Sequence, residues 1–323
     1  MWNNPATGPR YRRRRLLAWV LALGWACAGW QAASLAAPAR PQCAVTRLAA
    51  VAVDRSAGVP IVTVEVNDQP ARFVLDTGAE RTMISPAAAD RLALARDEWV
   101  ATSTRGVSGF IERMRNANPR SITLGGLPLR HRSLARDSSL VVATVPRITP
   151  DAPVDGLLGR DFLSAFDLWL DLSARSLLLF DVKGCSGDFL PWAGPHAAVP
   201  IETPIASAMI IPVQVNGVRL RALFDTGASR SLIAAPGMAR LDLSPAALTG
   251  PSQTAAGIGP LPVAVKEHRF RSLQVVPAIS EPATLLVAPV RVLPFADMLL
   301  GSDWIGERAV WISFSTRQVF VSW

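Results

Sequence analysis

The chain contains an internal repeat, and this repeat restricts the possible folds more than any other feature of the sequence. Val64–Asn67 reads Val-Glu-Val-Asn, and 149 positions later Val213–Asn216 reads Val-Gln-Val-Asn. The same spacing aligns Phe73–Ala79 with Ala222–Ala228 without a gap. Similarity at one fixed spacing indicates a duplicated structural unit.

A second repeated block closes each half of the chain. Asp155–Arg175 aligns without a gap with Asp297–Arg317, here at a spacing of 142 residues. The first half therefore contains seven more residues between its two blocks than the second half does. Since both blocks are kept while the stretch between them varies in length, the sequence predicts two homologous halves.

Residues 183–200 are predicted to link the two halves, because their three Gly and three Pro residues disfavour regular structure. This places the N-terminal lobe at 44–182 and the C-terminal lobe at 201–323. Within each lobe the apolar runs are short and alternating, as in Ile61–Val66 and Ile210–Val215. We therefore expect an all-β fold, with brief helices near 86–94, near 161–166 and at the equivalent places of the second lobe.

The basic residues are concentrated at the N-terminus. The chain has a formal net charge of +8, but residues 1–36 hold five Arg and no acidic residue, which leaves +3 for the remainder. We therefore predict that nucleic acid is not a partner.

The N-terminal segment, residues 1–36, has the order of an export signal. Its Arg cluster precedes an apolar run, Leu16–Trp30, and then small residues up to Ala37. We expect an exported protein, periplasmic or extracellular. Cleavage after Ala36 is preferred, and the alternative is that the segment stays as a membrane anchor.

Cleavage would leave Cys43 and Cys185 as the two remaining thiols, since Cys27 lies in the apolar run. An even number of thiols in an oxidising compartment favours a disulfide between them. The alternative is a pair of buried free thiols.

Two Asp-Thr-Gly sequences occupy equivalent places in the duplicated chain, and each follows an apolar strand. A symmetric duplication brings equivalent loops together at its pseudo-twofold axis, which would set the carboxyls of Asp76 and Asp225 side by side. Two close carboxylates share one proton, so one can activate a water while the other polarises a scissile carbonyl. The pattern predicts peptide hydrolysis with no metal or other cofactor.

The residues after each aspartate are expected to support the loops. The hydroxyls of Thr77 and Thr226 can form hydrogen bonds across the axis. Gly78 and Gly227 let backbone approach the carboxylates closely, since they carry no Cβ.

The two Asp-Thr-Gly-Ala loops, Asp76–Ala79 and Asp225–Ala228, are each completed by a Leu-Leu-Gly element, Leu157–Gly159 and Leu299–Gly301. Together they resemble the retropepsin and pepsin superfamily of aspartic proteases, over most of residues 58–323. The resemblance implies a bilobal pepsin-like fold: two closed β-barrel-like halves with the active site between them. In that family the later Gly-containing strand packs beside the catalytic loop.

Two further features follow from the resemblance. The alanines at the fourth loop position, Ala79 and Ala228, are typical of retropepsins. Because both loops lie in one chain, we expect a monomer acting on a peptide or protein substrate.

Family members cover the cleft with hairpin flaps, and the expected counterparts lie at residues 104–110 and 255–260. The expected flap residues are Gly106, Val107, Gly109, Gly257, Ile258 and Gly259. The flap of pepsins carries a Tyr, whereas the only Tyr here is Tyr11. A plain hairpin without a flap role is the alternative at the second site.

The remaining polar candidates are given structural roles. Three histidines lack metal-ligand spacing and predict no metal site: His131, His196 and His268. Asp161 and Asp303 are expected to cap short helices, and Trp169 and Trp311 to be core residues.

Both halves keep the acid, the hydroxyl and the glycine, so the sequence favours an aspartic endopeptidase. The alternative from another class is a catalytically silent module that grips an extended peptide. A protease with one dedicated target is a third possibility.

Overall fold

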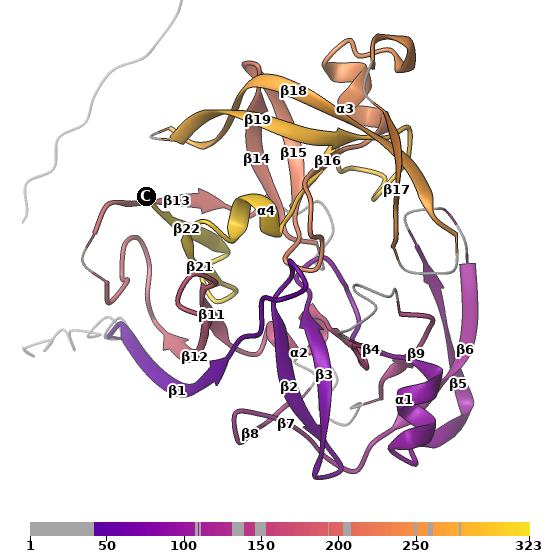
Figure 1. Ribbon diagram of the computed structural model, residues 1–323. Coiled ribbons are helices and arrows are strands. Elements are labelled where there is room, and N and C mark those ends of the chain that lie inside the picture. The colour runs from indigo at the N-terminus through magenta and orange to yellow at the C-terminus, as the bar shows by residue number, and fades with distance from the viewer. Residues whose placement is uncertain are drawn as a thin grey trace, which may run out of the picture. The chain divides into compact units, whose positions relative to one another are not determined.

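The computed structural model describes residues 42–323, apart from 107–108, 110, 131–138, 146–152, 193, 203–207, 249–250, 258–260 and 278 (Figure 1). Residues 41–323 form one compact unit. The predicted export segment and its Cys27 lie outside the described residues, as does His131. Among the described residues, no helix is long and apolar enough to cross a bilayer. The fold is all-β, as predicted.

The first half forms a seven-stranded sheet in the order β8-β7-β2-β3-β10-β4-β9, which makes a half-barrel. A hairpin of two strands, β5 and β6, lies outside this sheet and is linked to it by one isolated bridge, Ala117 to Leu140. The elements are β2 (Ile61–Val66), β3 (Gln69–Leu75), β4 (Met83–Ile84), α1 (Pro86–Arg91), β5 (Ala95–Arg105), β6 (Ile111–Asn118), β7 (Ile122–Leu124), β8 (Leu127–Pro128), β9 (Val141–Val142), β10 (Gly156–Leu158) and α2 (Arg160–Leu163).

The second half forms the equivalent sheet in the order β14-β15-β20-β16-β19-β18-β17. Here an additional pairing of β14 with β18 closes the sheet into a barrel. The elements are β14 (Ile210–Val215), β15 (Val218–Phe224), β16 (Leu232–Ile233), α3 (Ala235–Arg240), a 3₁₀ turn (Pro245–Ala247), β17 (Ser252–Ala255), β18 (Val263–Val276), β19 (Ile279–Val287), β20 (Met298–Leu300) and α4 (Ser302–Ile305).

A six-stranded antiparallel sheet joins the two halves, with three strands from each side of the repeat (Figure 1). Its order is β1 (Ala44–Ala52), β12 (Ser176–Lys183), β11 (Asp167–Asp171), β21 (Ala309–Ser313), β22 (Gln318–Ser322) and β13 (His196–Pro200). At its centre the repeat equivalents Trp169 and Trp311 stand opposite each other in the register. The pseudo-twofold axis of the duplication therefore passes between these two residues. The predicted linker contains β13, the counterpart of β1.

The repeated Val-x-Val-Asn sequence has a structural cause. In β2, Val64 and Val66 are buried while Glu65 between them is exposed, as period-two alternation requires. Asn67 then adopts a left-handed φ of 51°, and its Oδ1 accepts hydrogen bonds from the backbone N–H of Arg120 (2.6 Å) and Ser121 (3.2 Å). Asparagine tolerates this conformation and can join the turn to a neighbouring segment.

The second half repeats this arrangement. Asn216 has a φ of 50°, and its Oδ1 accepts from the N–H of Arg271 (2.8 Å) and Ser272 (3.2 Å). The asparagine is therefore kept in both copies because each turn uses both its conformation and its side chain.

An aromatic cluster covers one face of the six-stranded sheet. Trp311 is fully buried and packs against Phe180, with ring centroids 4.4 Å apart. Trp192, from the predicted linker, packs edge-on against half-buried Trp169 at 5.4 Å, and Phe189 packs against Trp311 at 6.0 Å. The segment between the halves is thus packed onto the sheet that joins them.

The predicted disulfide is present: Cys43 and Cys185 are bonded, 142 residues apart in sequence. It ties the start of β1 to the segment that follows β12. Closing a loop of this length removes conformational entropy from the unfolded chain.

We predict that replacing both cysteines by serine lowers the free energy of unfolding by up to about 5 kcal/mol, the chain-entropy estimate for such a loop. Urea denaturation of the full chain measures this change. Reductant should destabilise the wild type and leave the double variant unchanged; equal stability of the two proteins without reductant would contradict the prediction.

Candidate active site

Two strands deliver the Asp-Thr-Gly loops to the same place. Asp76 directly follows β3, and Asp225 directly follows β15. β10 lies parallel to β3, and β20 lies parallel to β15. The N–H of Asp76 donates to the carbonyl of Leu158, and that of Asp225 to the carbonyl of Leu300, both at 3.0 Å. Each Leu-Leu-Gly strand therefore holds its loop, as the family resemblance implied.

The threonines of the two loops bind each other across the pseudo-twofold axis. The N–H of Thr77 donates to the hydroxyl of Thr226 (3.0 Å), and the N–H of Thr226 to that of Thr77 (3.1 Å). Each hydroxyl donates in turn to the opposite half: Thr77 to the carbonyl of Phe224 (2.7 Å) and Thr226 to that of Leu75 (2.5 Å). Both threonines are fully buried. Every loop thus completes its hydrogen bonding with atoms of the other half.

Each of the two carboxyls lies close to the glycine of the opposite loop. A Cβ placed on Gly78 would overlap the carboxyl of Asp225, and one placed on Gly227 would overlap the carboxyl of Asp76. Each carboxyl therefore rests on the glycine of the opposite loop. Only glycine leaves room for this approach, and the arrangement puts the two acids side by side, as we expected.

Backbone donors hold the carboxyls in place. Oδ1 of Asp76 accepts from the N–H of Ala79 at 2.8 Å. Oδ1 of Asp225 accepts from the N–H of Gly227 (2.9 Å) and of Ala228 (3.2 Å). The alanines thus contribute their backbone at equivalent positions of the two loops.

Burial and mutual repulsion raise the affinity of this pair for protons. Asp76 is only 8% exposed, and this burial raises the pKa of its carboxyl. Burial, together with the negative charge of Asp76, raises the pKa of Asp225 well above its ordinary value. Since two adjacent carboxylates repel each other strongly in a buried site, the pair retains one proton over a wide pH range.

Asp161 and Asp303 do not cap helices, contrary to our expectation. The N-cap residues of α2 and α4 are Gly159 and Gly301, which have no capping side chain. Asp161 instead accepts from the N–H (2.9 Å) and the hydroxyl (2.6 Å) of Thr82. The hydroxyl of Thr82 also accepts from the N–H of Gly159 at 2.9 Å.

Asp303 makes the same contacts with Ser231, at 2.9 Å and 2.7 Å, and Ser231 accepts from the N–H of Gly301 at 2.9 Å. These aspartates brace the strand that follows each Asp-Thr-Gly loop.

Sequence reasoning missed one residue of this region, Arg160. It is only 7% exposed, and its guanidinium donates to the carbonyl of Thr77. In the other half Ser302 makes the equivalent bond, from its hydroxyl to the carbonyl of Thr226 at 2.8 Å. The alignment of the second repeated block could have identified Arg160, because this cation aligns with a neutral residue, Ser302.

Both segments expected to form flaps belong to antiparallel hairpins. β5 pairs with β6 up to Arg105 and Ile111, and the N–H of Gly109 donates to the carbonyl of Gly106 at 3.0 Å. β17 pairs with β18 up to Ala255 and Val263, and Gly257 follows β17. The other predicted flap residues, Val107, Ile258 and Gly259, lie outside the described residues.

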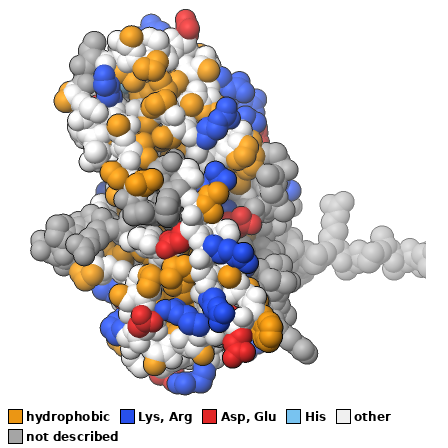
Figure 2. Space-filling view, turned by 90° about the vertical axis from the view of Figure 1, so that its right-hand side faces the viewer, with side chains coloured by type: hydrophobic (Ala, Val, Ile, Leu, Met, Phe, Trp, Pro, Cys, Tyr) orange, Lys and Arg blue, Asp and Glu red, His pale blue; other side chains and the backbone are white. Residues whose placement is uncertain are grey.

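Basic side chains on the face seen in Figure 2 are interspersed with acidic and apolar ones. Pairs of opposite charge account for part of this mixture in the molecule. Arg96 contacts Asp90 at 2.8 Å in the first half, and Arg230 contacts Glu267 at 3.1 Å in the second.

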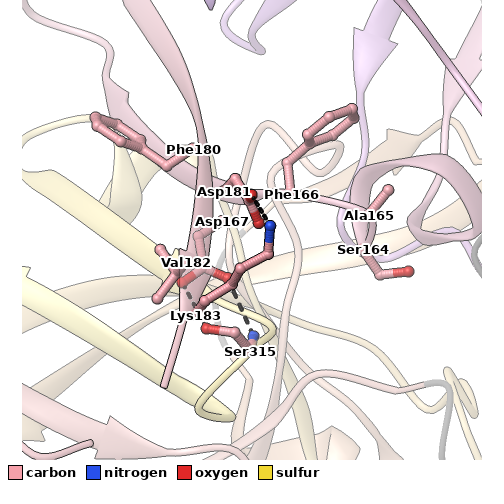
Figure 3. A pocket seen from close by; sticks show the side chains of 9 residues that line it. All are labelled: Ser164, Ala165, Phe166, Asp167, Phe180, Asp181, Val182, Lys183 and Ser315. Carbon is pink, nitrogen blue, oxygen red and sulfur yellow. Dashed lines mark hydrogen bonds and ion pairs between the residues drawn. The ribbon is translucent and has the colours of Figure 1, made fainter. Parts of the chain in front are cut away.

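A surface pocket next to the six-stranded sheet is separate from the aspartate pair (Figure 3). Asp167 lies in it and accepts from the hydroxyls of Ser313 (2.6 Å) and Ser315 (3.0 Å), while Lys183 contacts Asp181 at 2.6 Å. The pocket is lined by Ser164, Ala165, Phe166, Asp167, Phe180, Asp181, Val182, Lys183 and Ser315. Its charged groups are already paired, so it offers no argument for a ligand.

The histidines in the described part of the chain serve packing. His196 contacts Asp188 at 3.0 Å and packs against Trp192, and His268 packs against Phe270. In the same part of the chain, no group of three or more His, Cys, Asp or Glu side chains is arranged to hold a metal ion.

Two duplicated β lobes with paired Asp-Thr-Gly loops define the aspartic protease class. The sequence model of the aspartyl protease family matches residues 62–162 and 211–304, which make up more than half of the chain. This protein therefore belongs to the aspartyl protease family. No curated protein matches the sequence.

A crystal structure of an aspartic proteinase from Irpex lacteus has a similar fold, with a TM-score of 0.52 and 14% sequence identity. The match covers 86% of this chain and 97% of that one. At this identity the likeness concerns the fold alone.

We predict that Thr226→Val destabilises the protein by about 1–3 kcal/mol for each buried group that loses its partner, here the N–H of Thr77 and the carbonyl of Leu75. Valine keeps the shape of threonine and removes only its hydroxyl. Thr226→Ser, which keeps the hydroxyl, is the matched control. Urea denaturation should rank the valine variant clearly below the serine variant, and equal stability would refute the role of the hydroxyl.

We further predict that Asp225→Asn stabilises the protein at neutral pH. Because the pKa of Asp225 is raised in the folded state, its contribution to stability is fully present below the ordinary Asp pKa. That contribution is lost as the pH rises toward the folded-state pKa. The amide cannot ionise, so the stability of the variant relative to the wild type should increase as the pH rises from 3 to 7.

Thermal unfolding across this pH range tests the prediction. Asp242→Asn, at an exposed position, is the control and should track the wild type. A stability difference between Asp225→Asn and the wild type that is the same at pH 3 and pH 7 would contradict the prediction.

Proposed function

We propose that this protein is an aspartic endopeptidase that hydrolyses peptide bonds with a water activated by Asp76 and Asp225. One observation carries the proposal: each carboxyl rests on the glycine of the opposite loop, which brings the two acids together in a shared site. Membership of the aspartyl protease family and the two-lobed fold support it.

The proposed reaction uses the shared proton of the pair. The ionised carboxylate takes a proton from water as the water oxygen bonds to the carbonyl carbon of the substrate. The protonated carboxyl gives its proton to the carbonyl oxygen, which yields a tetrahedral diol. When the C–N bond breaks, the carboxyl that took the water proton gives it to the leaving nitrogen. The other carboxylate takes a proton from a diol hydroxyl, which restores the initial singly protonated pair.

The hydrogen-bonded frame suits this chemistry. The loops are fixed by the four bonds of the threonine pair and by backbone donors to both carboxyls. A preorganised site does not have to reorient its groups as charge develops in the transition state. We include in the proposal that the hairpins β5–β6 and β17–β18 act as flaps over a bound peptide.

The setting of the enzyme is part of the proposal. The export-like segment at residues 1–36 supports a periplasmic or extracellular protein, cleaved or tethered at that segment. Since both loops belong to one chain, we propose that a monomer is active, so that the specific activity does not fall on dilution.

We predict that Asp76→Asn and Asp225→Asn each reduce cleavage by at least 10²–10⁴-fold, the usual contribution of a general acid or base. The purified full chain is incubated with a diverse peptide pool from acid to neutral pH, and cleavage products are counted by mass spectrometry. The wild-type rate should be bell-shaped in pH, because one proton must be present on the pair and one absent. Asp242→Asn, at an exposed position, is the control.

Full activity of either dyad variant would refute the mechanism. A folded wild type that binds peptides from the pool without cutting them would instead establish the silent peptide-binding module. If the folded wild type neither binds nor cuts the pool peptides, a protease with one dedicated target is the hypothesis that remains.

A further inference from the structure

The surroundings of the two aspartates are nearly symmetric in their hydrogen bonds but not in their charge. Asp76 and Asp225 each receive backbone N–H groups from their own loops, and each donates its N–H to a strand carbonyl. The side chains that reach behind the loops differ. Arg160 begins α2 in the first half, and Ser302 begins α4 at the equivalent place.

Arg160 is a buried cation beside the first catalytic loop. Its Nη1 donates to the carbonyl of Thr77, the residue next to Asp76, and its Nε has no hydrogen-bond partner among the described residues. A guanidinium that loses its hydration in this way is costly unless negative charge lies nearby. The bond itself does not require a cation, because Ser302 makes the same bond to Thr226 with a neutral hydroxyl.

The other charged groups near the dyad do not cancel this difference. Arg81 pairs with Asp161 at 3.3 Å, and Arg230 pairs with Asp303 at 3.6 Å at the equivalent positions. These pairs occur in both halves, so they favour neither aspartate.

Glu267, which also pairs with Arg230 at 3.1 Å, is an asymmetric charge of the second half, but it is partly exposed. Glu80 is an asymmetric charge of the first half, because Ser229 stands at its place in the second. It contributes to the electrostatic surroundings of Arg160, together with Asp76, Asp225 and Asp161. Glu80 is exposed, however, so water screens its charge. Arg160 is buried and is screened much less.

We propose that Arg160 is a positioning residue that keeps the single negative charge of the dyad on Asp76 and the proton on Asp225. The inference rests on the proposed protease function and deepens it: Asp76 becomes the base that activates water, and Asp225 becomes the acid that protonates the carbonyl oxygen. The charges and hydrogen bonds around each carboxyl are consistent with this assignment. Burial raises the pKa of Asp76, but the hydrogen bond from Ala79 and the charge of Arg160 oppose this rise.

The first test measures protonation directly, with Arg160 in place. Two full-length variants, Asp225→Asn and Asp76→Asn, are labelled with ¹³C at the aspartate carboxyls and titrated by NMR. Each variant keeps one carboxyl of the dyad. We expect Asp76, alone, to titrate at lower pH than Asp225, alone. The opposite order, or equal titration, would overturn the proposal.

The second test asks whether Arg160 is the cause. In the Asp225→Asn background, Arg160→Ser copies the residue of the second half, and Arg160→Gln keeps a donor without the charge. Both should move the titration of Asp76 to higher pH, while Arg160→Lys should hold it near its original position. Ser302→Ala, which removes the equivalent bond without removing a charge, should leave it unchanged.

An unchanged Asp76 titration in a folded Arg160→Ser or Arg160→Gln protein would refute the assignment. If the serine variant does not fold, the glutamine variant and the first test still decide. Because NMR reads protonation and not cleavage, an inactive wild type with the expected titrations would count against the proposed function and leave the electrostatic role of Arg160 standing.

Discussion

The reciprocal hydrogen bonds between Thr77 and Thr226 are the constraint on which the rest of the site depends. The buried N–H and hydroxyl of each threonine donate hydrogen bonds of 2.5–3.1 Å to oxygen atoms of the other half. An unpaired polar group in such a fully buried place is costly, so neither half can satisfy its own loop alone. The same contact sets the distance between the loops, and this distance places each carboxyl on the opposite glycine. Cohesion of the two halves and assembly of the aspartate pair thus have one physical origin.

Comparing the two halves separates what the site requires from what can vary. Asp161 with Thr82 and Asp303 with Ser231 form the same brace, and serine replaces threonine there because only the hydroxyl is used. The frame further from the loops differs: the second half closes into a barrel, whereas the first leaves the hairpin β5–β6 as a separate sheet. The seven extra residues of the first half lie in this variable stretch. The duplication has therefore kept the loops and their braces while the outer strands diverged.

The sequence predicted those features that repeat or that follow from residue type. The fixed spacing of the two Asp-Thr-Gly copies predicted two lobes, and the short alternating apolar runs predicted an all-β fold. The two thiols outside the export-like segment predicted the disulfide. The role of Asp161 was mispredicted because its partner Thr82 is 79 residues away, and local sequence suggested only the adjacent helix. The Gly- and Pro-rich segment before residue 200 was predicted as a linker, but its end forms β13, since an antiparallel partner, β22, was available only in three dimensions. Arg160 was missed because a sequence does not show where an arginine side chain points.

A symmetric pair of acids has no intrinsic preference for which member carries the proton, yet the proposed reaction needs one base and one acid. In a homodimer of identical halves such a preference can come only from the substrate. A duplicated single chain can build it into the protein, because its halves can differ in charge. Here the backbone donors to the two carboxyls are alike, and the buried difference is a guanidinium against a hydroxyl at one position of the repeat. Duplication within one chain thus allows the loops to stay paired by symmetric bonds while a residue behind them assigns unequal roles to the two aspartates.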